Sequence, residues 1–199
     1  MQTGEDKAWE TLADLDPEDV CKRAGVQFNR ESGLYTLKSF GMEFSIFPKA
    51  KSMSGTAAES SLLLGRLAYF FRLSVPWYLI SAKEIPFTGR LVKPADLAGG
   101  QLFFRGSHIL PLDKMAEKFG GNTVNFMKRG GELGGEPLDY GDASFRFYPL
   151  PRVPVIMILW GADEEFPARA DLLFDSTCEL HLPLDIIWSV AMMSILIML

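Results

Sequence analysis

The sequence predicts an α+β fold, in which an antiparallel β-sheet packs against a long central helix and a C-terminal helix. Strand patterns occupy residues 26–47 and 143–175, and apolar residues recur at helical spacing within 57–74. An uncharged apolar segment covers 186–199. Strands early and late, with helices between them, do not give the regular alternation of a doubly wound fold. The chain of 199 residues, 48% of them hydrophobic, is long enough for one domain with a real core.

The first 25 residues predict an N-terminal helical segment that divides at Asp16 and Pro17. Asp16 suits a helix N-cap, Pro17 suits the first turn, and Gly25 suits the end of the helix. From Val26 onward, apolar and polar residues alternate on both sides of a turn at residues 30–33, which predicts a small antiparallel meander.

The middle of the chain predicts helices joined by irregular connections. The helix over 57–74 is expected to be the main core helix and to be interrupted by Pro76, and the alternative is that PWYLISA continues for a further turn before Pro86 forces a break. Residues 85–110 contain prolines and glycines among short apolar pieces, which indicates an irregular connection packed over the sheet. Two short helices are predicted next, and the glycine-rich stretch 130–142 is interpreted as a flexible surface turn because it lacks a phosphate-loop pattern. The two helices are expected at Pro111 to Phe119 and from Asn122 or Thr123 through Lys128.

The strongest pattern is an antiparallel hairpin near the C-terminal end. Its first strand is predicted over Val153 to Trp160, and its six consecutive apolar residues indicate a central strand covered on both faces. The second strand is predicted over Ala170 to Asp175. The turn between them contains three adjacent carboxylates.

These carboxylates, Asp163, Glu164 and Glu165, form the main candidate site. Their crowding is expected to raise the pKa of at least one of them and to attract a hard cation or a basic partner. Adjacent residues do not point the same way on an extended chain, so a metal site needs ligands from elsewhere, such as Asp142, Asp175 or His108. An ordinary solvated turn is the alternative interpretation.

Further candidates lie outside the turn. Arg105 suits an anion anchor and His108 a base or a ligand, although one histidine without a second nearby is more often structural. Cys178 and His181 form a CxxH pair, which is half of a metal site, and a cysteine is commonly a small buried residue. The ligand-binding candidates are Arg105, His108, Trp160, Asp163, Glu164, Glu165 and Asp175, and the weaker metal candidates are Asp163, Glu165, Cys178 and His181.

Composition excludes several classes of protein. The net charge of −5 and the lack of a basic run argue against binding to nucleic acid. Cys21 and Cys178, far apart and without a CxxC, exclude a zinc knuckle or an iron-sulfur cluster built by this chain alone and favour a reducing cytoplasm. The first ten residues lack the pattern of a signal peptide.

The apolar segment from Ile186 to Leu199 is too short to span a membrane, because fourteen helical residues reach only ~21 Å. A helix that is apolar all round must still be buried. We therefore expect a protein partner or a homodimer through this segment, or a continuation of the chain.

The chain resembles a prokaryotic family known as domain of unknown function 3786. The resemblance rests on the hairpin LPRVPVIMILWGADEEFPARADLLFD, the later LPLD, and the earlier YLISAKEIPFTGRLVKPADLAGG, FFRGSH and GGEPLDYGDASFRF. It spans nearly the whole chain and implies no established activity, cofactor or catalytic residue. The family occurs mainly in anaerobes, and some relatives are fused to an iron-sulfur cluster domain, which implies redox or corrinoid-related surroundings.

Three hypotheses for function follow. The first is a non-catalytic accessory or binding protein in anaerobic metabolism, and it is the one we favour. The second is a metal- or ligand-dependent enzyme in which the acidic turn acts with Arg105 and His108, which requires these groups to converge. The third is a structural homodimer built on the C-terminal helix.

Overall fold

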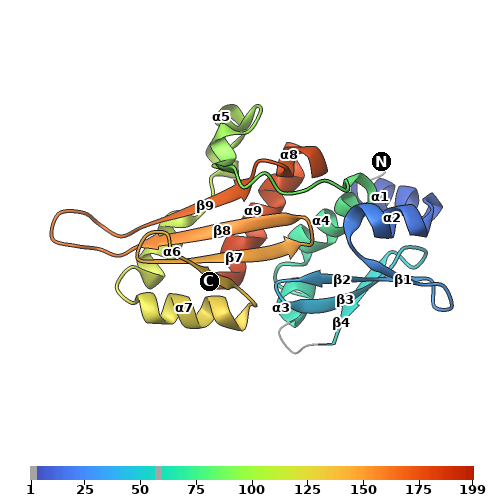
Figure 1. Ribbon diagram of the computed structural model, residues 1–199, viewed down its shortest axis with the longest axis horizontal. Helices are drawn as coiled ribbons and strands as arrows, with labels where there is room; N and C mark the ends of the chain where they lie inside the picture. The colour runs from blue at the N-terminus through green and yellow to red at the C-terminus, as the bar shows by residue number, and fades with distance from the viewer. Residues whose placement is uncertain (1–3, 57–59) are drawn as a thin grey trace.

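The computed structural model describes residues 4–56 and 60–199 and confirms an α+β fold (Figure 1). The α-helices are α1 (Gly4–Asp14), α2 (Pro17–Ala24), α3 (Ser60–Leu64), α4 (Ala68–Ser81), α5 (Gly100–Phe103), α6 (Leu112–Phe119), α7 (Thr123–Glu132), α8 (Cys178–His181) and α9 (Leu184–Met198). The strands are β1 (Gln27–Asn29), β2 (Leu34–Ser39), β3 (Met42–Phe47), β4 (Ser52–Gly55), β5 (Leu91–Val92), β6 (Glu136–Leu138), β7 (Ala143–Leu150), β8 (Val153–Trp160) and β9 (Arg169–Asp175). Two short 3-10 helices are η1 (Pro94–Asp96) and η2 (Gly106–His108).

The described strands form two antiparallel sheets, so the expectation of one sheet from 26–47 and 143–175 is wrong. The small sheet has the order β1-β2-β3-β4, and the large sheet has the order β5-β9-β8-β7-β6. The two sheets meet where the backbone N–H of Phe40 donates to the carbonyl of Tyr148 at 3.0 Å. Alternation within a strand predicts which face is buried, but it does not specify which distant strand becomes a neighbour.

One face of the large sheet carries the core. Phe145, Met157 and Leu172 are register partners on neighbouring strands, and all three are buried. Helices α6, α7 and α9 lie on this side, and α9 passes behind β7 and β8 in Figure 1. The opposite face of β7 and β8 is turned toward the viewer in the same figure.

Helix α4 differs from the predicted central helix. The prediction began at residues 57–59, which lie outside the described residues, and it expected a break at Pro76. Instead α3 ends at Leu64, and α4 starts at Ala68 and continues through Pro76. Proline removes one helical hydrogen bond and normally ends or kinks a helix. Here Pro76 is buried among other apolar groups of α4, and the packing of that helix offsets the lost bond.

Helix α9 is a central core element. It packs against α4 and α6, and its buried side chains lie around most of its circumference. These side chains are Ile186, Ile187, Ser189, Val190, Ala191, Met193, Ser194, Ile195, Ile197 and Met198. The chain's own core therefore accounts for the lack of charge in this segment. Within the described residues, no helix combines the length and apolar character needed to cross a membrane.

Local signals in the sequence agree well with the structure. The side chain of Asp16 accepts a hydrogen bond from the backbone of Glu18, and Gly25 ends α2 with a positive φ of 65°. Helix α6 ends before Gly120 as predicted, and α7 extends to Glu132, past the expected end at Lys128. The glycine-rich stretch 130–142 contains the edge strand β6 in addition to turns.

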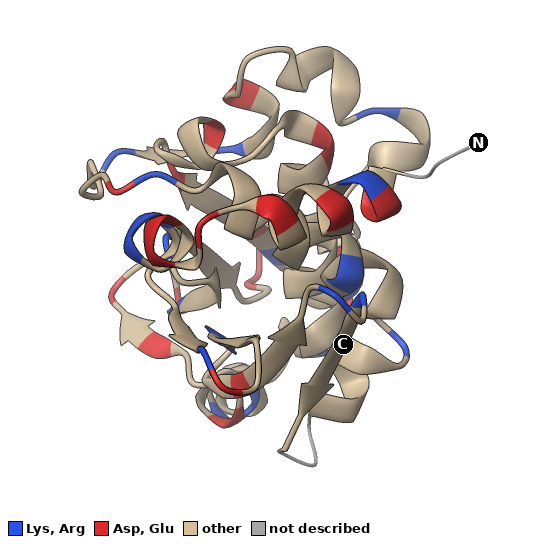
Figure 2. Ribbon diagram, turned by 90° about the vertical axis from the view of Figure 1, so that its right-hand side faces the viewer, with Lys and Arg blue, Asp and Glu red and all other residues tan. Residues whose placement is uncertain are grey.

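Charges at the α1 and α2 end of the molecule are mixed. Figure 2 looks onto this end, and acidic residues outnumber basic residues on α1 and α2. Basic residues of neighbouring segments pair with some of them, such as Lys51 with Glu10 at 3.0 Å.

Candidate functional site

The β8–β9 hairpin projects from the body of the molecule at the left of Figure 1. Trp160 and Arg169 are the register partners that end its ladder. The guanidinium carbon of Arg169 lies 4.0 Å from the centre of the Trp160 ring, in a cation–π contact. The exposed side chain of Arg169 makes no hydrogen bond or ion pair within the described part of the chain.

The turn beyond this pair is organised by Asp163. One of its carboxylate oxygens accepts hydrogen bonds from the backbone N–H groups of Glu165 at 2.8 Å and Phe166 at 2.7 Å. These bonds, first that from Phe166 and then that from Glu165, lower the pKa of Asp163 below its ordinary value. Asp163 is therefore not a carboxylate whose pKa crowding raises, because backbone donors stabilise its charged form.

The base of the turn is anchored to neighbouring elements. The backbone N–H of Gly161 donates to a carboxylate oxygen of Asp142 at 2.7 Å, and that of Ala162 donates to the carbonyl of Gly120 at 3.3 Å. Gly120 also lies close to Ala168 in the hairpin. A Cβ at position 120 would stand only 2.1 Å from the Cβ of Ala168, so a larger residue would not fit there. The hairpin is thus held at its base, and only its tip extends freely.

A cleft of about 620 Å³ opens beside the tip. Trp160 and Asp163, which line the cleft, were predicted from the sequence as site residues. Phe166 and Arg169 line it too and were not predicted as site residues. The lining residues are Asp142, Trp160, Gly161, Asp163, Phe166, Pro167, Ala168 and Arg169. Phe166 is 66% exposed, which is unusual for a phenylalanine. The predicted hairpin register could have identified Arg169, because it places that residue opposite Trp160.

Glu164 and Glu165 are exposed at the tip. Neither side chain makes a hydrogen bond or an ion pair within the described residues. Both carboxylates are therefore available to a binding partner, unlike that of Asp163.

Asp175 lies at the other end of β9 from the tip, roughly 20 Å away along the strand at ~3.3 Å per residue. It is 3% exposed. Its carboxylate accepts hydrogen bonds from the backbone and hydroxyl of Thr88, from the backbone of Gly89, and from the backbone and hydroxyl of Thr177. Burial raises its pKa, but these donors outweigh burial and the net shift is downward. Asp175 thus fixes the 86–90 connection to the sheet.

Cys178 and His181 are both buried on α8. Burial raises the pKa of the Cys178 thiol to about 12, so the thiol is protonated at neutral pH. Burial, with the nearby charges of Arg152 and Lys83, lowers the pKa of His181 to about 4. No group of three or more His, Cys, Asp or Glu side chains among the described residues is placed to hold a metal ion.

Arg105 and His108 belong to a different part of the structure. The His108 ring stacks on Phe103 at 4.4 Å between ring centres and meets Trp188 of α9 at 5.0 Å. The Trp188 indole N–H donates to the backbone carbonyl of His108 at 3.0 Å. Arg105 is exposed in the same connection. None of these contacts joins the pair to the acidic tip.

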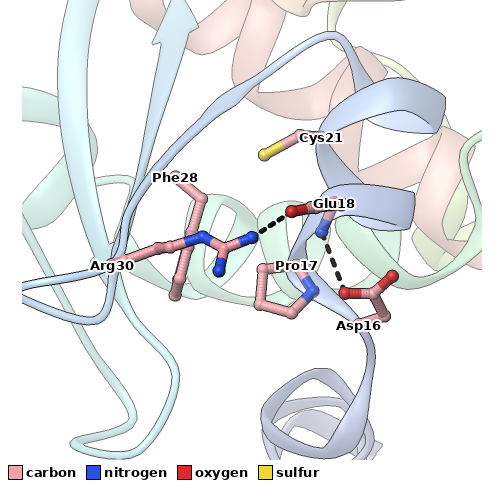
Figure 3. Close-up of a pocket in the computed structure, with 6 residues that line it drawn as sticks. All are labelled: Asp16, Pro17, Glu18, Cys21, Phe28 and Arg30. Atoms are coloured by element: carbon pink, nitrogen blue, oxygen red, sulfur yellow. Dashed lines mark hydrogen bonds and ion pairs between the residues drawn. The ribbon is translucent and has the colours of Figure 1, made fainter.

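A second cleft, of about 560 Å³, was not predicted (Figure 3). It lies between α2 and β1, and Glu18 and Arg30 form an ion pair across it. The Cys21 thiol lines it and has a raised pKa, from burial first and then from Asp16 and Glu18. Sequence spacing gave no signal for this cleft, because its two walls come from separate elements.

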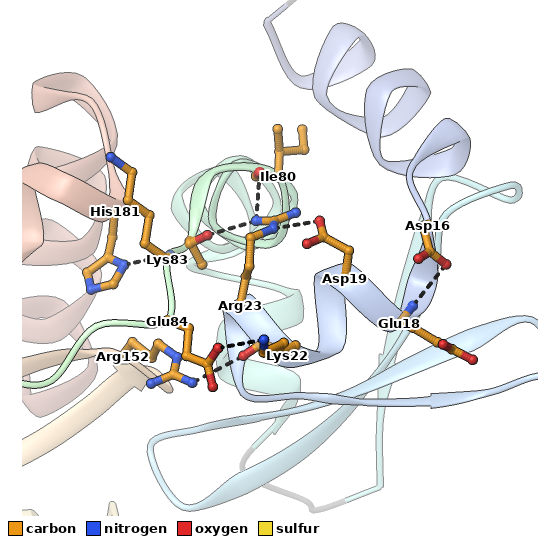
Figure 4. A network of polar contacts seen from close by, with 11 residues as sticks. Asp16, Glu18, Asp19, Lys22, Arg23, Ile80, Lys83, Glu84, Arg152 and His181 are labelled. Atoms are coloured by element: carbon orange, nitrogen blue, oxygen red, sulfur yellow. Dashed lines mark hydrogen bonds and ion pairs between the residues drawn. The ribbon is translucent and has the colours of Figure 1, made fainter.

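A polar network joins α2 to the large sheet (Figure 4). The Arg23 guanidinium donates to the carbonyls of Ile80 at 3.1 Å and Ala82 at 2.7 Å. The backbone N–H of Lys83 donates to Nδ1 of His181 at 3.2 Å, and Arg152 donates to the carbonyl of Lys22 at 3.2 Å. His181 therefore has a structural role as an acceptor.

Comparison with known proteins gives one match. A family model with the description "Domain of unknown function (DUF3786)" matches residues 16–196. No curated protein and no solved structure matches the chain.

Proposed function

We propose that this chain, which belongs to the DUF3786 family, is a non-catalytic binding protein that engages a cationic polypeptide segment of a partner through the tip of the β8–β9 hairpin. The observation that carries the proposal is the composition of the tip. Two free carboxylates, Glu164 and Glu165, stand beside the exposed ring of Phe166 and next to a cleft.

The chemistry of the tip favours a basic partner. Asp142 and the three acidic residues of the turn outnumber the single cation Arg169, so the local field attracts positive charge. Exposed aromatic side chains next to a concave surface are typical of the residues that dominate binding energy at interfaces. Phe166 and the Trp160–Arg169 pair supply such a surface.

The turn is held in shape before any partner arrives. The hydrogen bonds to Asp163, together with those of Gly161 and Ala162, fix the backbone from which Glu164 and Glu165 project. A preorganised surface loses less conformational entropy on binding. The association with redox or corrinoid-related metabolism and the cytoplasmic location remain predictions within this proposal.

The test is selection from a display library of random dodecapeptides on the purified full-length protein. We expect enrichment of peptides rich in Lys and Arg that also carry an aromatic residue, with an affinity that falls as salt rises. The variant E164Q/E165Q removes the free carboxylates and keeps Asp163 in place. It should bind a selected peptide about two- to thirtyfold more weakly, at ~0.2–1 kcal/mol for each of the two exposed charge pairs.

The matched control is E31Q/E43Q, which removes two exposed carboxylates of the small-sheet region and gives the same change in net charge. It should bind like the unmodified protein. Enrichment of neutral or acidic peptides, or an equal loss in both variants, would overturn the proposal.

A further inference from the structure

The uncovered face of the large sheet carries a groove of about 180 Å³, separate from the hairpin tip. Its floor is formed by β7 and β8, and its walls come from the connection before β5 and from the turn between β6 and β7. The lining residues are Phe87, Gly89, Leu91, Leu138, Tyr140, Arg146, Tyr148, Pro154, Ile156 and Asp175. A groove of this size admits a small group, since sites for drug-sized ligands measure ~300–1,000 Å³.

Three aromatic rings from three separate segments face this groove. Phe87 and Tyr148 lie with ring centres 6.4 Å apart and planes inclined at 43°. Tyr140 lines the groove from the turn between β6 and β7. Phe87 is 46% exposed and Tyr140 is 47% exposed, so their ring surfaces remain accessible.

The walls are held in place by specific contacts. The backbone N–H of Tyr140 donates to the hydroxyl of the buried Ser144 at 3.0 Å. Gly141 follows with a φ of 58°, and a Cβ there would stand 2.8 Å from Ile158. On the other side, Asp175 binds Thr88 and Gly89 next to Phe87. The backbone segments that carry Phe87 and Tyr140 are therefore held in place by the fold.

The charges around the groove favour a cation. Arg146 contributes the positive charge of the lining, and Glu136 pairs with it at 3.3 Å. Asp175 is a buried carboxylate whose hydrogen bonds are all made within the fold, so it acts on the groove through its charge and not as a direct ligand. Glu136 lies outside the lining but offsets the charge of Arg146, which leaves the negative charge of Asp175 without a cationic partner within the described residues.

We propose that this groove binds a small organic cation of the alkylated ammonium type. Aromatic rings attract such cations through their negative faces, and a quaternary ammonium group cannot be recognised by hydrogen bonds. The groove combines accessible rings, the negative charge of Asp175 and a size suited to a compact head group. This site is independent of the hairpin tip, so either proposal can fail without the other.

The test is a titration of the isotopically labelled full-length protein with choline, followed by amide chemical shifts. A parallel titration uses 3,3-dimethylbutan-1-ol, which has the same shape without the charge. We expect choline to shift the amide signals around Phe87, Tyr140 and Tyr148. The neutral alcohol should bind at least about fivefold more weakly than choline. Equal binding of the two compounds, shifts confined to other regions, or no binding of choline would each overturn the proposal.

Two variants sharpen the test. Tyr140→Leu keeps an apolar side chain at an exposed position and should weaken choline binding about fivefold. Tyr69→Leu, at another exposed tyrosine outside the groove lining, is the control and should not change it. If Tyr140→Leu folds with a native spectrum and binds choline unchanged, the aromatic ring is not part of the site and the proposal is wrong.

Discussion

The two ends of strand β9 place acidic residues in opposite circumstances. At the Asp175 end the carboxylate is buried and accepts hydrogen bonds from Thr88, Gly89 and Thr177. At the Arg169 end, Glu164 and Glu165 are exposed and make no such bonds within the described residues. The same residue chemistry thus stabilises the fold at one end and stays available for binding at the other.

The difference shows how to separate structural from functional polar groups in this molecule. A buried carboxylate persists only where donors replace its water shell, so its partners are part of the fold. An exposed carboxylate keeps its water shell and contributes little to stability. Substitutions at the Asp175 end of β9 should therefore lower the free energy of unfolding clearly, and substitutions at the Arg169 end should change it little.

The largest effect is expected for Asp175→Asn. The amide keeps the size of the side chain but turns an NH₂ group toward donors and removes the charge, so the free energy of unfolding should fall by about 3 kcal/mol. Urea unfolding followed by tryptophan fluorescence measures the change. Asp171→Asn is the control on the same strand, where the carboxylate pairs with Lys93 at 3.3 Å near the surface, and it should cost at most about 1 kcal/mol. Equal losses of unfolding free energy in Asp175→Asn and Asp171→Asn would contradict the special structural role of Asp175.

Acid should destabilise the protein through His181. The unfolded chain binds a proton at this residue near its ordinary pKa of 6.5, whereas the folded protein binds one only near about 4. Between these values the unfolded state binds more protons, so the free energy of unfolding falls as pH falls, by up to about 3 kcal/mol. Asp175 acts below this window, because its contribution is lost as the pH falls from its ordinary pKa of 3.8 through its lowered pKa in the folded protein.

Urea unfolding at several pH values tests this expectation. His181→Asn can still accept a hydrogen bond from Lys83 but cannot titrate, so the slope of stability between pH 6.5 and about 4 should largely disappear. The other histidine provides the control, and His108→Asn should retain the slope. A slope that survives in His181→Asn would assign it to other groups.

The smallest effect is expected at the tip. Arg169→Ala removes the cation–π contact with Trp160. Because Arg169 is exposed, this contact contributes at most about 1 kcal/mol to the free energy of unfolding. Thermal or urea unfolding should therefore give nearly the same midpoint as the unmodified protein. A loss above about 2 kcal/mol, which is typical of a core substitution, would make the tip part of the structural core and end the contrast between the two ends.

Signals that depend on neighbouring residues predicted the structure well. The Asp16 cap, the end of α2 at Gly25 and the β8–β9 hairpin each depend on contacts within a few residues or across one turn. The separation into two sheets was not predicted, and the continuation of α4 through Pro76 was only an alternative to the expected break, because long-range packing decides both.

The candidate site was predicted only in part. The hairpin pattern located Trp160 and Asp163, which line the cleft beside the tip. The function of Asp175 depends on Thr88, which lies 87 positions away along the chain, and no pattern in a single sequence connects them. The same holds for the groove that Phe87 and Tyr140 line, because these two residues lie 53 positions apart along the chain.

The central position of α9 has a consequence for synthesis in the cell. This helix packs against α3, α4, α6 and α8, yet residues 184–198 are translated after every strand of both sheets. At about 5–20 residues per second, the ribosome needs roughly one second or more to pass from the end of β9 to the end of α9. During that interval α6 and α7 are already available to cover the core face of the large sheet, but α3, α4 and α6 lack their contacts with α9. The nascent chain should then expose apolar surface that chaperones recognise, and arrested ribosomes carrying chains that stop at residue 175 should show the strongest chaperone association.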